Sequence, residues 1–333
     1  MPKKRCLALL SGGLDSRLAI KLMQQQGIDI IALYFSLPFG TGCCMPDCAF
    51  NFAQTQGIKL KIIDCTKGKL FQEYMALIRK PKYGYGSAIN PCIDCRIFML
   101  KKAKALMSKL KAQFIVTGEV LNERPMSQTR KMLDVVEKES GLQGKLLRPL
   151  SAKLLPETEI EKQGLVDRNK LLDIQGRSRK KQIELAKKFE ISFPTPAGGC
   201  LLCEKEFAKR LRDLFEHRKK IEPRDIELLK LGRHFRYGKN KIIVGRNEQE
   251  NKKLEALAKK DFIFELKDFP GPVTLMQGRG TKKAIEITAA LTASYSDAPE
   301  GKRVIVNYRK GKLNKLLEVS QLNKKEIESM RLK

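Results

Sequence analysis

The sequence has no tryptophan among its 333 residues, and histidine occurs only twice. So few histidines argue against a histidine-based metal site or catalytic triad. Long apolar runs are also missing, since no stretch approaches the roughly 18 apolar residues that a membrane span needs. The short apolar run at residues 6–10 meets glycines and Asp15 too soon for a secretory signal. We therefore expect a cytoplasmic protein without a membrane partner.

Acidic residues are scarce relative to basic ones. The chain has 66 lysines and arginines against 37 aspartates and glutamates, which gives a formal net charge of +29. Such an excess indicates a polyanionic partner. The alternative is a solvated basic surface that serves solubility or heat resistance, because lysine-rich helices are common in stable proteins.

Cysteine is well represented, with nine residues that mostly fall into clusters. An odd number of clustered cysteines in a chain of this kind indicates metal or sulfur chemistry more than a disulfide framework. We expect Cys6 and Cys65 to be inert core residues, because they lie within or at the end of apolar strand patterns. The clusters are Cys43, Cys44 and Cys48, then Cys92 and Cys95, then Cys200 and Cys203.

The first half of the chain alternates strand and helix patterns. Strands are expected at residues 5–10, 30–35, 59–64 and 114–117, and helices are expected to begin near Leu14, Asp47, Gly68 and Cys95. This alternation predicts an α/β domain with right-handed crossovers and a parallel sheet covered by helices on both faces. Ligands of such sheets bind at the carboxyl ends of the strands, where the turns at Ser11 and at Thr117-Gly118 are expected.

The second half has a different texture. Residues 150–210 form a basic, helical extension that carries Cys200 in the loop "FPTPAGGCLLCEK". Helices are expected at 204–217 and 223–231, followed by the short strands "KIIVGR", "DFIFEL", "PVTLMQG" and "KRVIVNYRKGK". We predict two domains, a larger one at residues 1–210 and a smaller α+β domain at 211–333.

The stretch "SGGLDS", residues 11–16, joins the first expected strand to the first expected helix. Backbone N–H groups and the helix dipole at such a turn suit a bound anion. Gly12 and Gly13 allow it to approach closely, and Ser11 and Ser16 can donate hydrogen bonds. Asp15 would repel a bare phosphate, so it suits a magnesium ion or a helix cap. The alternative is a strand-to-helix turn that needs glycine for its conformation alone.

These six residues resemble the PP-loop signature of the ATP pyrophosphatase superfamily, whose domain is of the adenine nucleotide alpha hydrolase-like kind. Enzymes of that superfamily cleave ATP to AMP and pyrophosphate while they adenylate a carbonyl or carboxyl oxygen. The resemblance implies ATP and Mg²⁺ as cofactors and a catalytic role for Asp15. The residues that it places around the departing pyrophosphate are Ser11, Gly12, Gly13, Asp15 and Ser16.

Three further segments resemble RNA thiolation enzymes. The segment "NPCIDCRIFMLKK", residues 90–102, is similar to the part of tRNA 2-thiouridylases that carries a catalytic cysteine, here Cys95. Cys92 stands where those enzymes have an acidic residue. The turn "VTGEVLNERPMSQ", which includes Gly118, resembles a nucleotide-contacting turn. With "GTGCCMPDCAFNFAQTQGI" the resemblance covers residues 5–205 and puts Cys200 in the place of a second catalytic cysteine.

The cysteines are compatible with three chemistries. Cys92, Cys95 and Cys200 could hold a 4Fe-4S cluster with one iron open to bind sulfide. A persulfide on Cys95 or Cys200 could instead release its sulfur when the partner closes a disulfide. With Cys203 added, the two CxxC pairs could form a tetrahedral zinc site. The remaining cluster, Cys43, Cys44 and Cys48, either lines the same pocket or packs under its loop.

Residues 232–280 resemble the NFACT-type RNA-binding domain of ribosome-associated quality-control proteins. The specific points are "VGRNEQEN" and an aromatic strand that leads to "KDFPGP", and the match extends over residues 232–315. Basic side chains there suit phosphates, and aromatic ones suit unpaired bases. His234 and Phe235 are further flat surfaces, although Phe235 also fits a core position. The RNA-binding residues that we expect are Arg233, Arg236, Tyr237, Lys239 and Arg246.

Together the resemblances imply an ATP-dependent thiolation of tRNA. ATP would adenylate a uridine carbonyl oxygen, and sulfide or a persulfide derived from a cysteine desulfurase would displace AMP to give 2- or 4-thiouridine. The alternatives are another PP-loop ligase or amidotransferase, which has no need of the cysteines, and a non-catalytic RNA-binding factor.

Overall fold

The structure is a computed structural model that describes residues 4–40, 46–193 and 200–332. The chain divides into two compact units, Met1–Lys205 and Glu206–Lys333. The boundary falls five residues before the position 210 that the sequence suggested. In the part of the chain that is described, no helix is long and apolar enough to cross a membrane.

The first unit is built on a five-stranded parallel sheet in the order β3-β2-β1-β4-β5. Four of the strands lie within two residues of the expected positions, because their apolar runs are bounded by Gly, Asp and polar residues that end a strand. The fifth strand was not expected. The strands are β1 (Arg5–Leu9), β2 (Asp29–Ser36), β3 (Lys59–Asp64), β4 (Phe114–Val116) and β5 (Leu146–Leu147).

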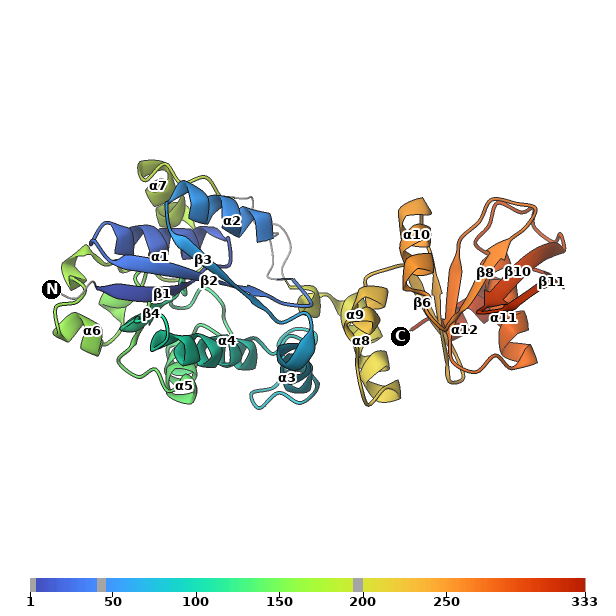
Figure 1. The fold of residues 1–333 in the computed structure, drawn as a ribbon, viewed down its shortest axis with the longest axis horizontal. Coiled ribbons are helices and arrows are strands. Elements are labelled where there is room, and N and C mark those ends of the chain that lie inside the picture. The colour runs from blue at the N-terminus through green and yellow to red at the C-terminus, as the bar shows by residue number, and fades with distance from the viewer. Residues whose placement is uncertain (1–3, 41–45, 194–199, 333) are drawn as a thin grey trace. The chain divides into compact units, whose positions relative to one another are not determined.

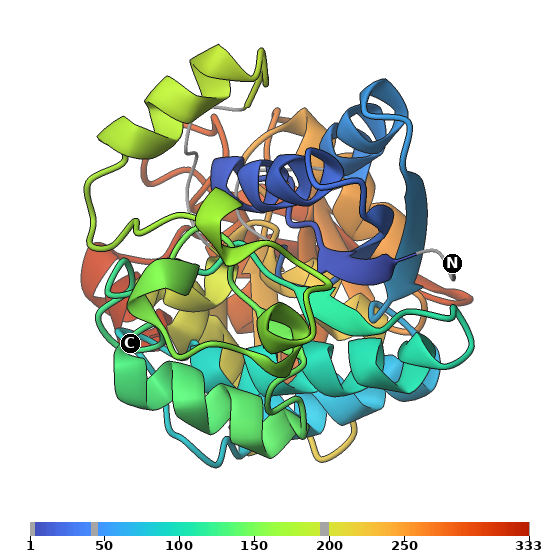
Figure 2. The ribbon, with the colours of Figure 1, turned by 90° about the vertical axis from the view of Figure 1, so that its left-hand side faces the viewer.

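Helices cover both faces of this sheet, as the alternating pattern predicted. Figure 1 shows α1, α2 and α7 on one face and α3, α4 and α5 on the other, and Figure 2 shows the same layers from a second direction. The apolar side chains of these helices and of the strands form the buried core. The helices are α1 (Leu14–Gln24), α2 (Pro46–Thr55), α3 (Gly68–Arg79), α4 (Cys92–Met107), α5 (Arg130–Ser140) and α7 (Lys180–Lys188).

The segment after residue 150 is helical only in short pieces. Its described residues contain α6 (Glu159–Lys162), α7 and the 3-10 turns Ala152–Leu154, Arg168–Lys170 and Leu201–Cys203. Ile160, Val166, Leu171 and Ile174 from this segment lie in the same buried cluster as strand β1. The segment is therefore part of the first unit's core.

The second unit is an α+β domain with a six-stranded antiparallel sheet in the order β11-β10-β8-β9-β7-β6. Side chains alternate between two buried faces, so Ile242 and Phe262 lie in one apolar cluster while Ile243 and Ile263 lie in another. Strands β6 and β11 were not expected. The strands are β6 (Arg233–Tyr237), β7 (Asn240–Val244), β8 (Phe262–Leu266), β9 (Thr274–Gln277), β10 (Val304–Lys310) and β11 (Leu313–Val319).

Five helices accompany this sheet. Those at 205–217 and 223–229 were expected from the sequence within two residues at each end. Leu228 lies in the same cluster as Ile243 and Leu254 of α10, and α11 contributes to the opposite cluster. The helices are α8 (Lys205–His217), α9 (Pro223–Leu229), α10 (Glu248–Leu257), α11 (Lys282–Ala293) and α12 (Lys324–Met330).

Candidate active site

The turn at residues 11–16 lies at the carboxyl end of β1 and leads directly into α1. Gly12 has a φ of 85°, which a residue with a side chain rarely adopts. Gly13 is the N-cap residue and has no side chain that could cap the helix, so N–H groups of the first turn are left for a ligand. Ser16 Oγ donates to the Gly13 carbonyl at 2.8 Å and lies 3.3 Å from Ser11 Oγ. The loop thus has the backbone geometry of an anion site.

Arg17 fixes this loop from the side of the helix. Its Nε donates to the Gly12 carbonyl at 2.8 Å, and one Nη donates to Ser192 O at 2.6 Å. The other Nη lies 2.8 Å from Cys48 Sγ. Cys48 therefore belongs to the support of the loop, and its placement agrees with the packing alternative. Cys43 and Cys44 lie outside the described residues.

Asp15 points from the first turn of α1 into a charged cluster. Its Oδ2 is 3.3 Å from an Arg179 nitrogen, and its Oδ1 is buried with no hydrogen-bond partner among the described residues. Burial raises the pKa of Asp15 despite the nearby Arg179 guanidinium. Burial, and then the charge of Asp15, also raise the pKa of Glu123. Carboxyl groups whose pKa is shifted by burial and by each other are typical of a functional site.

The turn after β4 lies beside this loop. β1 pairs with β2 on one side and β4 on the other, so the sheet reverses its strand order between β1 and β4, where ligands of such sheets bind. A Cβ on Gly118 would lie 2.5 Å from the backbone carbon of Asp15 and from the nitrogen of Ser16. Glycine is required there because two backbone segments touch. Contact of Gly118 with a nucleotide remains a prediction.

A buried ion network follows Gly118. Glu119, which is 2% exposed, lies 3.1 Å from both the Arg96 and the Arg148 guanidinium groups. Thr117 Oγ1 donates to the same carboxylate at 3.0 Å. Burial would raise the pKa of Glu119, but the two arginines outweigh it and lower that pKa. Because Arg96 follows Cys95, this network fixes the start of α4 against the carboxyl end of β4.

The first cysteine pair lies at the amino end of α4. Cys95 Sγ is 3.2 Å from the hydroxyl of the buried Tyr74, and Asn90 Nδ2 donates to Cys92 Sγ at 3.2 Å. Burial raises the pKa of Cys95 to about 11, even with the Tyr74 hydrogen bond and Arg96 acting against it. Cys92 is exposed. Cys95 is therefore held as a thiol at neutral pH, with an accessible thiol one helical turn away.

The second cysteine pair is brought to the first by two backbone hydrogen bonds. Leu201 N donates to Phe39 O, beyond the carboxyl end of β2, and Ile89 N donates to Leu202 O just before α4. Burial raises the pKa of Cys200 to about 12, and the charges of Cys95, Cys203 and Cys92 add to the rise. The fold thus joins two cysteine pairs that lie far apart in the sequence.

The described cysteines do not surround a single metal ion. Over residues 4–40, 46–193 and 200–332, no three His, Cys, Asp or Glu side chains are placed to hold one. The donor chemistry of Cys92, Cys95 and Cys200 suits a 4Fe-4S cluster, in which each thiolate binds a different iron, and the cluster stays a prediction. Of the other cysteines, Cys6 and Cys65 are buried, as expected for core residues.

Most of the basic residues expected to bind RNA are engaged within the second unit. Arg246 lies 3.0 Å from the Glu250 carboxylate, and an Arg236 nitrogen donates to Asp213 Oδ2 at 2.8 Å. Lys239 is exposed at the turn between β6 and β7. These contacts orient the side chains but do not test a role in RNA binding.

The aromatic candidates are largely interior. Phe235 is fully buried and His234 is buried, so the prediction that they offer open surfaces to bases is wrong. They lie on a strand whose alternating faces are both covered. Tyr237 is half-buried against the same core, and Arg233 sits over the ring of Tyr295 with its guanidinium carbon 4.8 Å from the centroid.

The sequence reasoning missed several residues of the site. Glu119 and Glu123 lie in the turn that was singled out, but nothing local marked them as charged partners. Arg179 was one of many basic residues in a lysine-rich stretch, and Tyr74 was not singled out. No local signal could have paired them with Asp15 and Cys95, because the tertiary fold makes those pairs.

The fold and the loop define a parallel α/β domain with an anion-site geometry at the start of α1, followed by a smaller α+β domain. Comparison with known families is consistent with this division. Residues 2–153 match the family model described as thiamine biosynthesis protein (ThiI), and residues 232–331 match the model described as NFACT protein RNA binding domain. The resemblance of the first unit to thiouridine-forming enzymes is thereby confirmed over residues 2–153, and the resemblance to NFACT-type domains over residues 232–331.

Curated relatives match a little over a third of this chain. A tRNA-specific 2-thiouridylase MnmA of Desulforamulus reducens is 32% identical over 131 residues, which is 35% of each chain. The MnmA of Amoebophilus asiaticus is 32% identical over 139 residues, covering 37% of this chain and 36% of the relative. This chain thus spans about a third of their length. A solved complex of a 4-thiouridine synthetase with RNA and bound ATP gives a TM-score of 0.42 at 17% identity, over 68% of this chain and 52% of that one.

Proposed function

We propose that the protein is a tRNA sulfurtransferase that uses ATP to convert a uridine into 2- or 4-thiouridine. The observation that carries this proposal is the juxtaposition of Cys95 and Cys200, brought together by the fold at the same sheet edge as the loop at residues 11–16. The ThiI-type and NFACT-type segments and the thiouridylase relatives support it.

The first step activates the uridine. The carbonyl oxygen attacks the α-phosphorus of ATP, and pyrophosphate leaves. The N–H groups at the start of α1, with the hydroxyls of Ser11 and Ser16, bind the phosphoryl oxygens and stabilise the developing charge. Asp15 Oδ1, which is buried and without a partner among the described residues, suits one position around Mg²⁺, and the ion would supply charge neutralisation on the phosphates.

The second step delivers sulfur through the chain's own thiols. A persulfide on one of Cys95 and Cys200 attacks the activated carbon with its outer sulfur, and AMP leaves. The thiol of the other cysteine then attacks the inner sulfur and closes a disulfide. The electron pair of the broken S–S bond passes to the outer sulfur, which becomes the thiocarbonyl. An external thiol reductant restores the two thiols, and a persulfide donor reloads one of them.

A 4Fe-4S cluster remains the alternative route for sulfur. It would take thiolates from Cys92, Cys95 and Cys200, and the mutual effect of their charges supports the idea that they can approach. In this route the cluster would supply an open iron that binds sulfide beside the activated uridine. Iron and sulfide analysis of anaerobically purified protein decides the point, with about four irons per chain expected if the cluster forms.

The test uses the full chain with ATP, Mg²⁺, unmodified tRNA, a persulfide donor and a thiol reductant, and measures thiouridine and pyrophosphate. Cys95→Ser and Cys200→Ser should each lose thiouridine formation by at least about 10²-fold while tRNA-dependent pyrophosphate release persists. Cys6→Ala, in the interior of β1, is the matched control and should keep both.

Two results would replace the proposal. Full activity of Cys95→Ser would favour a PP-loop ligase that transfers nitrogen and needs no thiol. Absence of pyrophosphate release with tRNA and ATP would favour an RNA-binding factor without catalysis.

A further inference from the structure

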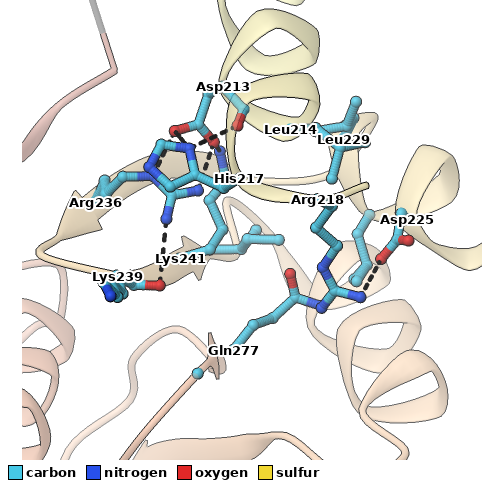
Figure 3. A pocket seen from close by; sticks show the side chains of 13 residues that line it. Asp213, Leu214, His217, Arg218, Asp225, Leu229, Arg236, Lys239, Lys241 and Gln277 are labelled. Carbon is cyan, nitrogen blue, oxygen red and sulfur yellow. Dashed lines mark hydrogen bonds and ion pairs between the residues drawn. The ribbon is translucent and has the colours of Figure 1, made fainter. Parts of the chain in front are cut away.

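A pocket of about 180 Å³ lies in the second unit, between helices α8 and α9 and one face of the antiparallel sheet (Figure 3). The two helices lie within residues 205–229, which neither family model matches. The helical wall of the pocket thus lies outside both family matches, while its strand floor lies within residues 232–331. We call this cavity the α8–α9 pocket.

Its floor is a row of polar side chains across three neighbouring strands. Arg236 of β6 is directly opposite Lys241 of β7, and Lys241 is directly opposite Gln277 of β9. Directly opposed residues point to the same face of a sheet. A guanidinium, an ammonium and a carboxamide thus lie side by side beneath α8, and all three line the pocket. We call Arg236, Lys241 and Gln277 the polar row.

Gln277 ends this row without a bonding partner for its amide nitrogen. The residue is 8% exposed, and its Nε2 is buried with no hydrogen-bond partner among the described residues. Figure 3 shows its carboxamide pointing into the pocket toward the guanidinium of Arg218, which comes from the segment after α8. The amide nitrogen of Gln277 and the guanidinium of Arg218 are both hydrogen-bond donors, and they face the same space. An acceptor placed between them would therefore accept a hydrogen bond from each.

The charges around the pocket favour a negative ligand. Four lysines and arginines line it against two aspartates, and both aspartates are engaged. Asp213 accepts from Lys241 Nζ at 2.7 Å and from Arg236. Asp225 accepts from Glu222 N at 2.9 Å and lies 3.4 Å from Arg218. Cations thus outnumber carboxylates along the described lining of the pocket.

The pKa of Lys241 reflects the crowding of positive charges around the pocket. Its side chain is buried, and burial lowers its pKa to about 8 although Asp213 acts to raise it. The charges of Arg236 and Arg210 lower the pKa further. A bound anion would relieve the repulsion among these cations.

We propose that the α8–α9 pocket is a binding site for a phosphate group, held by Gln277, Arg218 and the cations of the polar row. Guanidinium groups bind phosphate through paired N–H donors, and the carboxamide N–H adds a neutral donor that fixes its position. The volume admits a phosphate with waters and one face of a sugar but not a folded protein segment. The phosphate belongs either to an RNA backbone or to a free ion, and the two sources are separable by experiment.

The test measures binding of inorganic phosphate to the full chain by calorimetry, and binding of a fluorescent single-stranded RNA by anisotropy. Gln277→Met removes the donor without changing charge or length and should weaken phosphate binding about 10-fold. Gln249→Met, at an exposed position of α10, is the matched control and should bind as the wild type does. The wild type, Gln277→Met and Gln249→Met share the same loop at residues 11–16. Any phosphate that binds to this loop therefore contributes equally to the three measurements.

A second pair of variants covers the case in which Gln277→Met fails to fold. Arg218→Gln should weaken phosphate binding at least as strongly as Gln277→Met. Arg212→Gln, at an exposed position of α8, removes the same charge and should leave the phosphate affinity within about twofold of the wild type.

The outcomes separate the sources. If Gln277→Met weakens RNA binding by a similar factor and phosphate displaces the RNA, the site takes a backbone phosphate. If phosphate binding falls and RNA binding does not, the site takes a free phosphate. Equal phosphate affinity in the wild type, Gln277→Met and Arg218→Gln would overturn the proposal. The inference does not rest on thiolation, since a chain without that activity would still bind phosphate here.

Discussion

The thiol of Cys95 is buried beside Tyr74, and burial raises its pKa to about 11. At neutral pH the free protein therefore keeps this sulfur protonated and slow to react. A site of this kind limits loss of the thiol to oxidation, since the thiolate is the reactive form.

The pH dependence of alkylation tests this state of Cys95. In the free protein, the rate of modification by iodoacetamide should rise about tenfold per pH unit between pH 7 and 9, because the thiolate fraction rises by that factor below the pKa. Mass spectrometry of peptides resolves each site, and Cys6 should stay unmodified in the folded protein because it is fully buried. A rate for Cys95 that levels off below pH 8 would show that the thiol is activated in the free protein.

The buried carboxylate of Asp15 lowers the stability of the fold, although the proposed reaction needs it. Burial raises its pKa, so the folded state disfavours the ionised form. The resulting destabilisation is absent below the unfolded pKa and complete above the folded pKa. Asp15→Asn should therefore keep or raise Tm at pH 7, with the difference vanishing as the pH falls toward 4, while pyrophosphate release drops on the order of 10²-fold.

Calorimetry at pH 7 and near pH 4 measures the difference in Tm between Asp15→Asn and the wild type, and the pyrophosphate assay measures the loss of activity. The control is Asp173→Asn, an exposed partner of Lys181, which should change neither quantity. A lower Tm for Asp15→Asn at pH 7 would show that the carboxylate serves the fold through Arg179.

Among the elements, β4 and α4 are joined by the buried carboxylate of Glu119. The carboxylate lies 3.1 Å from Arg96 of α4 and from Arg148, which follows β5. The network orients the amino end of α4, and with it Cys92 and Cys95. Its removal should therefore affect the site as well as the fold.

Glu119→Gln should destabilise the protein by about 3 kcal/mol. The substitution removes a buried charge that pairs with the half-exposed Arg96 and with the buried Arg148, while Arg148 keeps its pair with Glu137 at 2.9 Å. Chemical denaturation measures the change. Glu139→Gln, which breaks the exposed pair with Lys82, is the control and should have little effect. A change for Glu119→Gln as small as that of the control would show that Arg96 and Arg148 find other partners.

The sequence predicted the parallel sheet well and the second sheet less well, for physical reasons. The runs around Leu7, Ala32 and Ile115 are continuous and apolar, as expected of strands buried on both faces. Strand β5 has two residues and shows no period. Strand β6, "RHFRY", reads as a basic surface segment, and only pairing with β7 buries His234 and Phe235.

The candidate site was predictable in part. The loop at residues 11–16 could be placed because glycine, serine and the strand-to-helix change are local. The pairs Asp15 with Arg179 and Cys95 with Tyr74 could not, since they depend on how distant segments pack. The polar row of the α8–α9 pocket depends in the same way on the register of three strands.

In the whole molecule, the division at Lys205 and Glu206 separates the cysteines from the NFACT-type segment. We expect residues 206–333, produced alone, to unfold in one cooperative transition, because the unit has its own apolar clusters on both faces of its sheet. Its affinity for single-stranded RNA should fall with salt, with a log–log slope of about 0.7 per phosphate contact.

Circular dichroism on heating and RNA titrations at several salt concentrations check this expectation, with residues 1–205 as the comparison. A cooperative 206–333 fragment that shows no RNA affinity would contradict the assignment of RNA binding to the second unit.

The proposed thiolation of tRNA can be tested by mass spectrometry of nucleosides from the tRNA of cells with and without the gene, followed by restoration with the wild type and with Cys95→Ser. We expect one thiouridine to disappear with the gene, to return with the wild type and to stay absent with Cys95→Ser. A set of thiolated nucleosides that is the same with and without the gene would contradict the proposal.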